Sequence, residues 1–257
     1  MCIIDTTEST NIGNIKKPKK LNLSVSKNNF LNRMIFSSNE EKEDCIKYLD
    51  LKGISYHTVL VNYIGFDENG KVEYKKVADL YRYDKRIRNI LYRFLSAFEE
   101  GIRAFISNRY SNNLNQIKSG KKLEEIKKNI SEGSSLSKEL ENLLFKELLD
   151  LSKELSLEVK KELYGKNIKH LRKNLNAIRE LRNVVSHHRI LCVYDDFEEC
   201  FLDDKKGDNL IDNIKNLYNL LNPYYKEFFK EQINNSCLDE DEPNFKNLLP
   251  EKAILVI

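Results

Sequence analysis

The stretch VADLYRYDKRIRNILYRFLSAFEEGIRAFISNRY, residues 77–110, decides the fold class. Its apolar residues recur at steps of three and four positions, the period of one face of an α-helix: Ile87, Ile90, Leu91, Phe94, Phe98 and Phe105. At about 100° per residue, polar side chains gather along one edge of that face: Asp84, Arg88, Tyr92, Glu99 and Arg103. The pattern predicts a helix over 77–110, whose polar edge is either a stripe of surface ion pairs or the wall of a groove.

The composition of the whole chain extends this prediction. Among 257 residues there are only nine glycines and four prolines, whereas Leu, Lys, Glu and Asn are abundant. Such a balance favours long helices over a turn-rich β architecture. We therefore expect an all-α protein, a helical bundle built from long amphipathic helices with a small irregular N-terminal appendage.

Further elements follow from local signals. Helices are expected over 38–53 (capped by Ser38 and stopped by Gly53), within 121–130, over 136–163, from about 167 through the motif at 180–191, and over 209–233, with Pro223 kinking or splitting the last. Residues 54–66 are rich in β-branched and aromatic side chains, and the turn signal DENG follows at 67–70. This segment predicts a short hairpin.

Composition shifts suggest four regions. Residues 1–25 are polar, aperiodic and contain KKPKK, which predicts a disordered basic arm, with contact to a nucleic-acid backbone as the alternative. Residues 26–75 form the appendage, and 76–235 form the helical domain. Residues 236–257 form a tail that is first acidic and then apolar.

Charge and cysteine usage narrow the class of protein. The 43 basic and 40 acidic residues leave a net charge of +3, so the overall charge neither demands nor excludes a nucleic-acid partner. Five cysteines lack metal-type spacing, and we expect reduced thiols in the cytoplasm. No signal peptide and no apolar run of about 20 residues is present, so we expect no membrane partner. Clustered metal ligands are not apparent either, and we expect no metal and no cofactor.

The candidate site lies in ELRNVVSHHRIL, residues 180–191, which holds two of the four histidines. With Arg182 at 0° on a helical wheel, Asn183 falls at about 100° and His187 at about 140°. Ser186 lies on the same polar arc. His188, at about 240°, is expected either to be a packed or hydrogen-bonded histidine in the apolar seam of Leu181 and Val184, or to bind backbone carbonyls at the helix end. The two histidines are therefore not equivalent, and His187 is the one expected to act with Arg182.

Imidazole and guanidinium together suit phosphoryl transfer. Imidazole moves protons near neutral pH, and the forked guanidinium matches non-bridging phosphate oxygens. RNA supplies its own nucleophile, the 2′-hydroxyl group, so no water has to be activated. The spacing alone is weak evidence, because it occurs by chance in many helices.

LRNVVSHHRIL resembles the signature of Abi-like (abortive infection) proteins of the HEPN superfamily, at Arg182, Asn183, His187, His188 and Arg189. The Tyr-rich segment GISYHTVLVNY and the L-Y-x-x-D pattern of VADLYRYD, with the helix that follows, are similar too. Ser186 replaces the Ala usual before the first histidine. No tyrosine stands two residues after His187, so the form of the motif that is regulated by nucleotidylation is absent.

The resemblance implies a four- to five-helix bundle acting as a metal-independent endoribonuclease on single-stranded RNA in phage defence, as a toxin of abortive infection. Arg182, His187 and Asn183 would be catalytic, and RNA would be bound by Arg88, Arg179, His188 and Arg189. Because the chain has one motif and HEPN catalysis uses two, the resemblance implies a homodimer, with the Leu-rich face of 136–163 and the Leu181/Val184 seam as candidate contacts. A structured noncoding RNA is a further expected partner.

Two alternatives remain open from the residues alone. The first is a catalytically inactive helical module that grips RNA or a protein through the same helix. The second is a structural bundle in which the polar residues only cap a helix. Substitution of Arg182 and His187 distinguishes them, since the first alternative predicts unchanged binding and the second predicts only a loss of stability.

Overall fold

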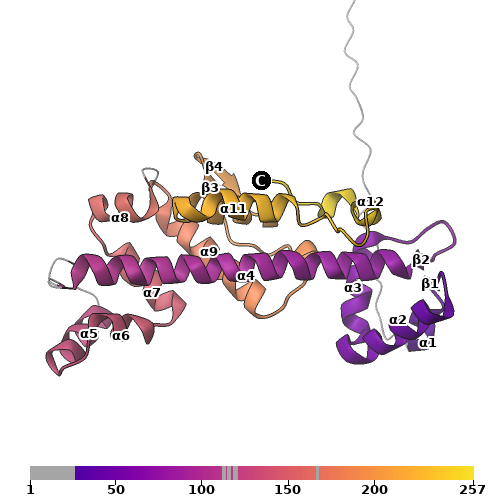
Figure 1. The fold of residues 1–257 in the computed structure, drawn as a ribbon, viewed down its shortest axis with the longest axis horizontal. Helices are drawn as coiled ribbons and strands as arrows, with labels where there is room; N and C mark the ends of the chain where they lie inside the picture. Colours follow the sequence, from indigo (N-terminus) through magenta and orange to yellow (C-terminus); the bar gives the residue numbers. More distant parts are fainter. Residues whose placement is uncertain (1–26, 112–113, 115–116, 118–120, 166–167) are drawn as a thin grey trace, which may run out of the picture. The chain divides into compact units, whose positions relative to one another are not determined.

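The computed structural model describes residues 27–111, 114, 117, 121–165 and 168–257. The basic arm expected at 1–25 lies outside this part of the chain. The structure divides into two compact units with the boundary between Val72 and Glu73. Most of the described residues are helical, which confirms the predicted all-α class (Figure 1).

The first unit contains α1 (Lys27–Leu31), β1 (Met34–Ile35), α2 (Asn39–Lys52), α3 (Ile54–Ile64) and the start of β2 (Val72–Glu73). The caps predicted for α2 are confirmed. The Ser38 hydroxyl oxygen accepts a hydrogen bond from the Glu41 N–H at 3.1 Å, and Gly53 ends the helix at φ 84°. This positive φ is the conformation that glycine adopts without strain.

The hairpin predicted from residues 54–66 is wrong, because 54–64 form helix α3. Its buried residues His57, Leu60 and Val61 follow the three- and four-residue spacing of a helix face, and their burial outweighs the β propensity of the segment. A turn does form at 67–70, where the Gly70 N–H donates to the Asp67 carbonyl. After this turn, the Val72 N–H donates to the Arg33 carbonyl at 3.0 Å. Strand β2 therefore pairs with β1 and not with residues 54–64.

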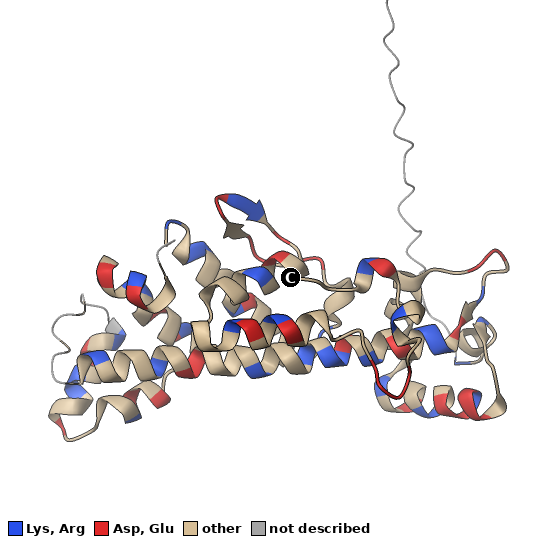
Figure 2. Ribbon diagram, turned by 45° about the horizontal axis from the view of Figure 1, so that its top comes forward, with Lys and Arg blue, Asp and Glu red and all other residues tan. Residues whose placement is uncertain are grey.

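The second unit is organised around α4 (Tyr74–Tyr110), which confirms the helix predicted over 77–110 and extends it by one turn. At 37 residues it is about 55 Å long. Its buried stripe packs against five helices that all follow it in the sequence: α6 (Leu136–Glu141), α7 (Phe145–Lys153), α9 (Leu171–Ser186), α11 (Pro223–Asn234) and α12 (Phe245–Leu248). Figure 2 shows Lys and Arg interspersed with Asp and Glu along the length of α4.

The single helix predicted over 136–163 is wrong, because the structure has three short helices there: α6, α7 and α8 (Leu157–Tyr164). Each break has its own N-terminal cap. The Leu144 N–H donates to the Glu147 carboxylate at 2.9 Å before α7, and the Ser156 hydroxyl accepts from Val159 before α8. Most apolar positions of the stretch are nevertheless buried across the breaks, among them Leu140, Leu148, Leu151, Leu155 and Val159. α5 (Lys121–Ser131) agrees with the basic helix expected within 121–130.

The segment after α9 contains the hairpin that the chain does form. Strand β3 (Cys200–Leu202) pairs antiparallel with β4 (Lys205–Gly207), with Leu202 opposite Lys205. Asp203 and Asp204 make the turn at φ 47° and 65°. Two positive φ angles are typical of a type I′ turn, which usually carries Asn-Gly, so the pair Asp203–Asp204 is a weak signal for this turn. The hairpin packs on α9 and on α10 (Leu210–Leu220).

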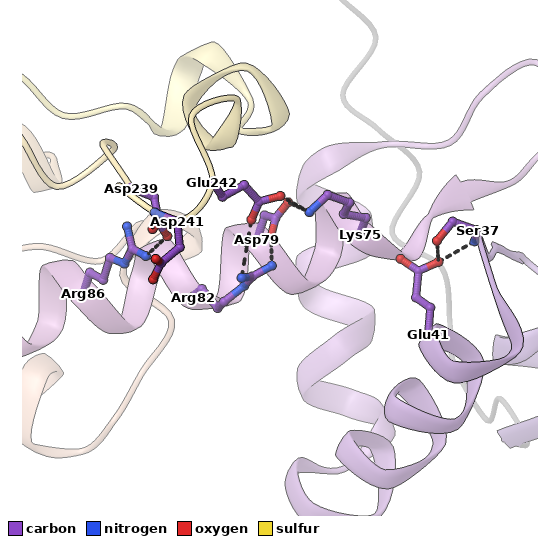
Figure 3. A network of polar contacts seen from close by, with 9 residues as sticks. All are labelled: Ser37, Glu41, Lys75, Asp79, Arg82, Arg86, Asp239, Asp241 and Glu242. Carbon is purple, nitrogen blue, oxygen red and sulfur yellow. Dashed lines mark hydrogen bonds and ion pairs between the residues drawn. The ribbon is translucent and has the colours of Figure 1, made fainter.

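The predicted break at Pro223 is confirmed, since Pro223 is the first residue of α11. The residues after α11 fold back onto α4, including η3 (Glu251–Ala253). Arg86 pairs with Asp239 and lies over the Phe245 ring at 4.5 Å, and Lys75 pairs with Glu242 (Figure 3). The acidic residues of 236–257 thus bind the basic edge of α4.

Candidate functional site

The predicted catalytic residues lie at the C-terminal end of α9. Leu181 and Val184 are fully buried on the core side of the last turns. Arg182 is exposed on the other side, Asn183 is half-buried, and His187 is the exposed residue that caps the helix. Arg182 and His187 are therefore both on the solvent side, as the wheel predicted, within the last turns and the cap of α9.

His188 does not pack into the seam, and that expectation is wrong. The helix stops at Ser186, and His188 adopts φ 53° with its side chain exposed. Its N–H donates to the Val185 carbonyl at 3.2 Å, and the Arg189 N–H donates to the Val184 carbonyl at 3.2 Å. This is the hydrogen-bond pattern of a Schellman motif, with histidine at the position that glycine usually takes. A helical wheel fails here because it assumes that the helix continues.

Arg182 has an aromatic neighbour. Its guanidinium carbon lies 5.9 Å from the centroid of the Phe145 ring, at the first residue of α7. A cation over an aromatic face gains about 0.5–1 kcal/mol at an exposed site and keeps its N–H groups available. Among the residues that the structure describes, no carboxylate lies within 4 Å of this guanidinium. Its charge is therefore available to an anion.

Asn183 belongs to a hydrogen-bonded network of side chains beside the site. Its side-chain amide donates to Glu180 at 3.4 Å, and the Tyr194 hydroxyl donates to the other Glu180 oxygen at 3.2 Å. The Arg189 guanidinium lies over the Tyr194 ring, 5.1 Å from its centroid. Partial burial and the Glu180 charge raise the pKa of Tyr194, so its hydroxyl stays protonated and donating. These contacts hold the backbone that follows His187 against α9.

Arg88 does not reach the surface as an RNA-binding residue would. Only 8% of it is exposed, and its guanidinium pairs with Asp84 one turn earlier on α4. The other Asp84 oxygen accepts hydrogen bonds from the N–H groups of Leu191 at 2.6 Å and Cys192 at 3.2 Å. The Asp84–Arg88 pair is therefore a buried clamp and not part of a surface stripe.

This clamp joins the two sequence blocks that carried the resemblance. Asp84 is the acidic residue of the L-Y-x-x-D pattern, and Leu191 ends the LRNVVSHHRIL block. Burial raises the pKa of the Asp84 carboxyl, against the opposing effects of Arg88 and the two amides. Burial, together with the Asp84 charge, also raises the pKa of the Cys192 thiol, so this cysteine is a packed thiol and not a nucleophile.

The rest of the predicted polar edge of α4 divides between surface and interior. Glu99 and Arg103 form an ion pair at 2.5 Å, and Arg103 also donates to the Leu143 carbonyl at 2.9 Å, which fixes the loop before α7. Tyr92 is 64% exposed. Arg179 is half-buried and lies along a groove formed by α7, α8 and α9. Sequence reasoning missed Phe145 and the lysines of that groove, because their positions depend on where 136–163 breaks.

The described residues contain no group of three or more His, Cys, Asp or Glu side chains placed to hold a metal ion. Nor does any helix in the described ranges have the length and apolar character needed to cross a membrane. No protein-family model matches the chain, and neither a curated protein nor a solved structure matches it. The functional argument therefore rests on the residues themselves.

Proposed function

We propose that this protein is a metal-independent endoribonuclease of the HEPN type that cleaves single-stranded RNA. The observation that supports the proposal is that Arg182 and His187 are both exposed at the C-terminal end of α9. The clamp from Asp84 to the backbone at 191–192 supports it, because it fixes the segment directly after the motif. A site for a charged transition state needs such fixed surroundings.

The chemistry assigned to these residues is transesterification. The 2′-hydroxyl oxygen attacks the adjacent phosphorus while an imidazole accepts its proton, and the 5′-oxygen leaves after it is protonated. The products are a 2′,3′-cyclic phosphate and a 5′-hydroxyl. The guanidinium of Arg182 stabilises the negative charge that builds on the non-bridging oxygens. Asn183, held by Glu180, orients the helix end, and Arg189 lies close enough to the motif in sequence to bind a neighbouring phosphate.

One chain supplies only one motif, so the complete site is assigned to a homodimer. The contact surface cannot be the one expected from sequence, since Leu181 and Val184 are fully buried and the leucines of 136–163 largely face the core of their own chain. Exposed aromatic residues on α11 offer an alternative surface, with Tyr224 94% and Phe228 47% exposed. The cellular role we assign is abortive infection in the cytoplasm, with a structured noncoding RNA as the partner that restrains the enzyme.

The test is cleavage of labelled single-stranded RNA by purified protein in the presence of a chelator. Wild type is expected to produce fragments ending in 2′,3′-cyclic phosphate. Arg182→Ala and His187→Ala are each expected to reduce the rate by at least about a hundredfold, the loss typical of a removed acid–base or charge-stabilising group. Product ends are identified by mass spectrometry.

The neighbouring histidine provides the matched control. His188→Gly removes an equally exposed imidazole, which the resemblance assigned to RNA binding and not to catalysis, and glycine suits the positive φ at this position. It is expected to weaken RNA binding and to keep the maximal cleavage rate at saturating RNA within a few fold. Thermal unfolding of all variants checks that the exposed substitutions leave the fold intact. Undiminished cleavage by His187→Ala contradicts the assigned site. Intact RNA binding without cleavage by wild type favours the inactive binding module instead.

A further inference from the structure

The groove between α7, α8 and α9 is strongly basic. It encloses about 700 Å³. Two acidic side chains, Asp150 and Glu154, line it together with six basic ones: Lys146, Lys153, Lys160, Lys169, Arg172 and Arg179. The whole chain carries nearly equal numbers of both signs, so this local excess of positive charge is a property of the groove and not of the composition.

Half of these cations already have partners in the fold. Lys153 pairs with Asp150 at 2.9 Å and donates to the Asn176 side chain at 3.0 Å. Lys160 donates to the Lys153 carbonyl at 3.1 Å, and Lys169 pairs with Asp204 at 3.0 Å. These contacts bridge α7 to α8 and α9 and so hold the groove walls together.

The other three, Lys146, Arg172 and Arg179, lie more than 4 Å from every carboxylate within the described ranges. Lys146 and Arg172 are exposed, and Arg179 is half-buried. Three cations that share a groove and lack a counter-charge repel one another. An extended anion would remove that repulsion.

The groove cations are in line with the candidate catalytic arginine. Arg172, Arg179 and Arg182 lie within about 80° on the α9 wheel, and Arg172 is two turns, or about 10 Å, before Arg179. Arg182 follows Arg179 after about 4.5 Å along the helix axis. Lys146 is adjacent to Phe145, over which Arg182 lies. The positive track therefore leads along α9 to the proposed scissile phosphate.

We propose that this groove binds the sugar–phosphate backbone of the single-stranded RNA beside the scissile bond, an inference that rests on the proposed function. Lys146, Arg172 and Arg179 bind successive phosphates, and Arg182 binds the phosphate that is cleaved. Leu157, 59% exposed in the groove wall, gives a ribose or base an apolar contact. An acidic peptide is the less suitable ligand, because it has no ribose or base to contact Leu157 and no phosphodiester to place at Arg182.

The experiment measures binding without cleavage. A labelled 2′-O-methyl oligoribonucleotide cannot supply the attacking hydroxyl, and its binding to the full chain is followed by fluorescence anisotropy at several salt concentrations. The groove variant is Lys146→Gln/Arg172→Gln/Arg179→Gln. The control variant, Lys42→Gln/Lys85→Gln/Lys230→Gln, removes the same charge from exposed positions outside the groove. A double variant that spares half-buried Arg179 guards against a folding defect.

The groove variant is expected to lower affinity at least about tenfold and to reduce the slope of log K against log salt by about 2, since each phosphate contact on a single strand contributes about 0.7. The control is expected to keep the slope of wild type. Wild-type affinity and slope in both groove variants would overturn the proposal. Tighter binding of polyglutamate than of RNA, lost in the groove variant, would overturn it too.

The outcomes separate this proposal from the proposed function. If wild type binds RNA through the groove but never cleaves it, the RNA-binding role of the groove stands and the ribonuclease proposal is refuted. If wild type cleaves RNA normally and the groove substitutions leave RNA binding unchanged, the ribonuclease proposal stands and the RNA-binding role of the groove is refuted.

Discussion

Asp84 connects α4 with the backbone that follows the candidate catalytic histidine. One of its oxygens accepts two N–H groups at 191–192, and the other pairs with Arg88. Both side chains are buried, so their charges depend on each other and not on water. Removal of one partner from a buried ion pair is far more costly than replacement of both.

Asp84→Asn is therefore expected to lower the free energy of unfolding by about 3 kcal/mol or more, because it keeps an oxygen for the two amides but removes the negative charge that pairs with the buried Arg88 guanidinium. Urea denaturation measures the loss. In the double variant Asp84→Asn/Arg88→Met, a good part of the stability is expected to return.

Glu99→Gln is the matched control, on the same helix and with the same i,i+4 pairing to Arg103. Its pair is partly exposed, so the expected loss is about 1 kcal/mol or less. Equal losses for Asp84→Asn and Glu99→Gln would show that burial of the first pair has no energetic consequence.

At this scale the helical wheel predicted the exposure of some site residues and not of others. Arg182 and His187 lie on the solvent side, as the wheel placed them. His188 was misplaced because the helix ends before it, and Arg88 was misplaced because burial of a charged residue depends on a partner segment about a hundred residues away. Periodicity contains no information on either point.

Helices α6, α7 and α8 divide a stretch whose leucine spacing predicts one continuous helix. The division is set by caps: Ser135 before α6, the Leu144–Glu147 contact before α7 and Ser156 before α8. Ser156 has an extended backbone, with φ −60° and ψ 158°, which is the conformation that suits a residue before proline.

Leu157→Pro is consequently expected to change the free energy of unfolding by less than about 1 kcal/mol, since Leu157 is the exposed first residue of α8 and its N–H has no intrahelical role. Lys161→Pro, one turn later, is expected to cost about 3 kcal/mol or more. Thermal unfolding of both variants checks this. A similarly large loss for Leu157→Pro would indicate that the helix continues through 156.

The signal for the break before α8 was present in the sequence, as Ser156 followed by Glu158, but periodicity outweighed it. The break before α7, capped through Leu144, had no such signal. Residues 54–64 show the opposite error, since β-branched side chains outweighed a helical spacing of buried positions. In both segments, local preference competes with burial in the core, and only the packed structure shows which one prevails.

At the scale of the whole molecule, the helical class and most helix positions of the second unit followed from composition and periodicity. The C-terminal residues did not, because their acidic run reads as a solvated tail, whereas Asp239 and Glu242 bind cations on α4. Oligomeric state is a property of the molecule that one chain does not contain, and the single motif per chain makes it decisive for the proposed activity.

Cleavage per chain is expected to fall on dilution, in parallel with dissociation of a dimer measured by sedimentation velocity, because a single chain has half of the proposed site. Tyr224→Lys/Phe228→Lys tests the exposed surface of α11 and is expected to weaken both association and cleavage. Tyr48→Lys, at a 40% exposed position of α2, is the control. A rate per chain that stays constant well below the dissociation constant would contradict a shared site.

The short helices along the basic groove have one more consequence. α7 and α8 contain nine and eight residues, fewer than the 12–15 or so that a helix needs to persist without tertiary support. Their amide protons should thus exchange with deuterated solvent through local opening, faster than those in the middle of α4. An RNA strand bound in the groove would bridge these helices to α9 and suppress the opening. Deuterium uptake over residues 145–164 would therefore report directly whether RNA occupies the groove, on unmodified protein and with unlabelled RNA.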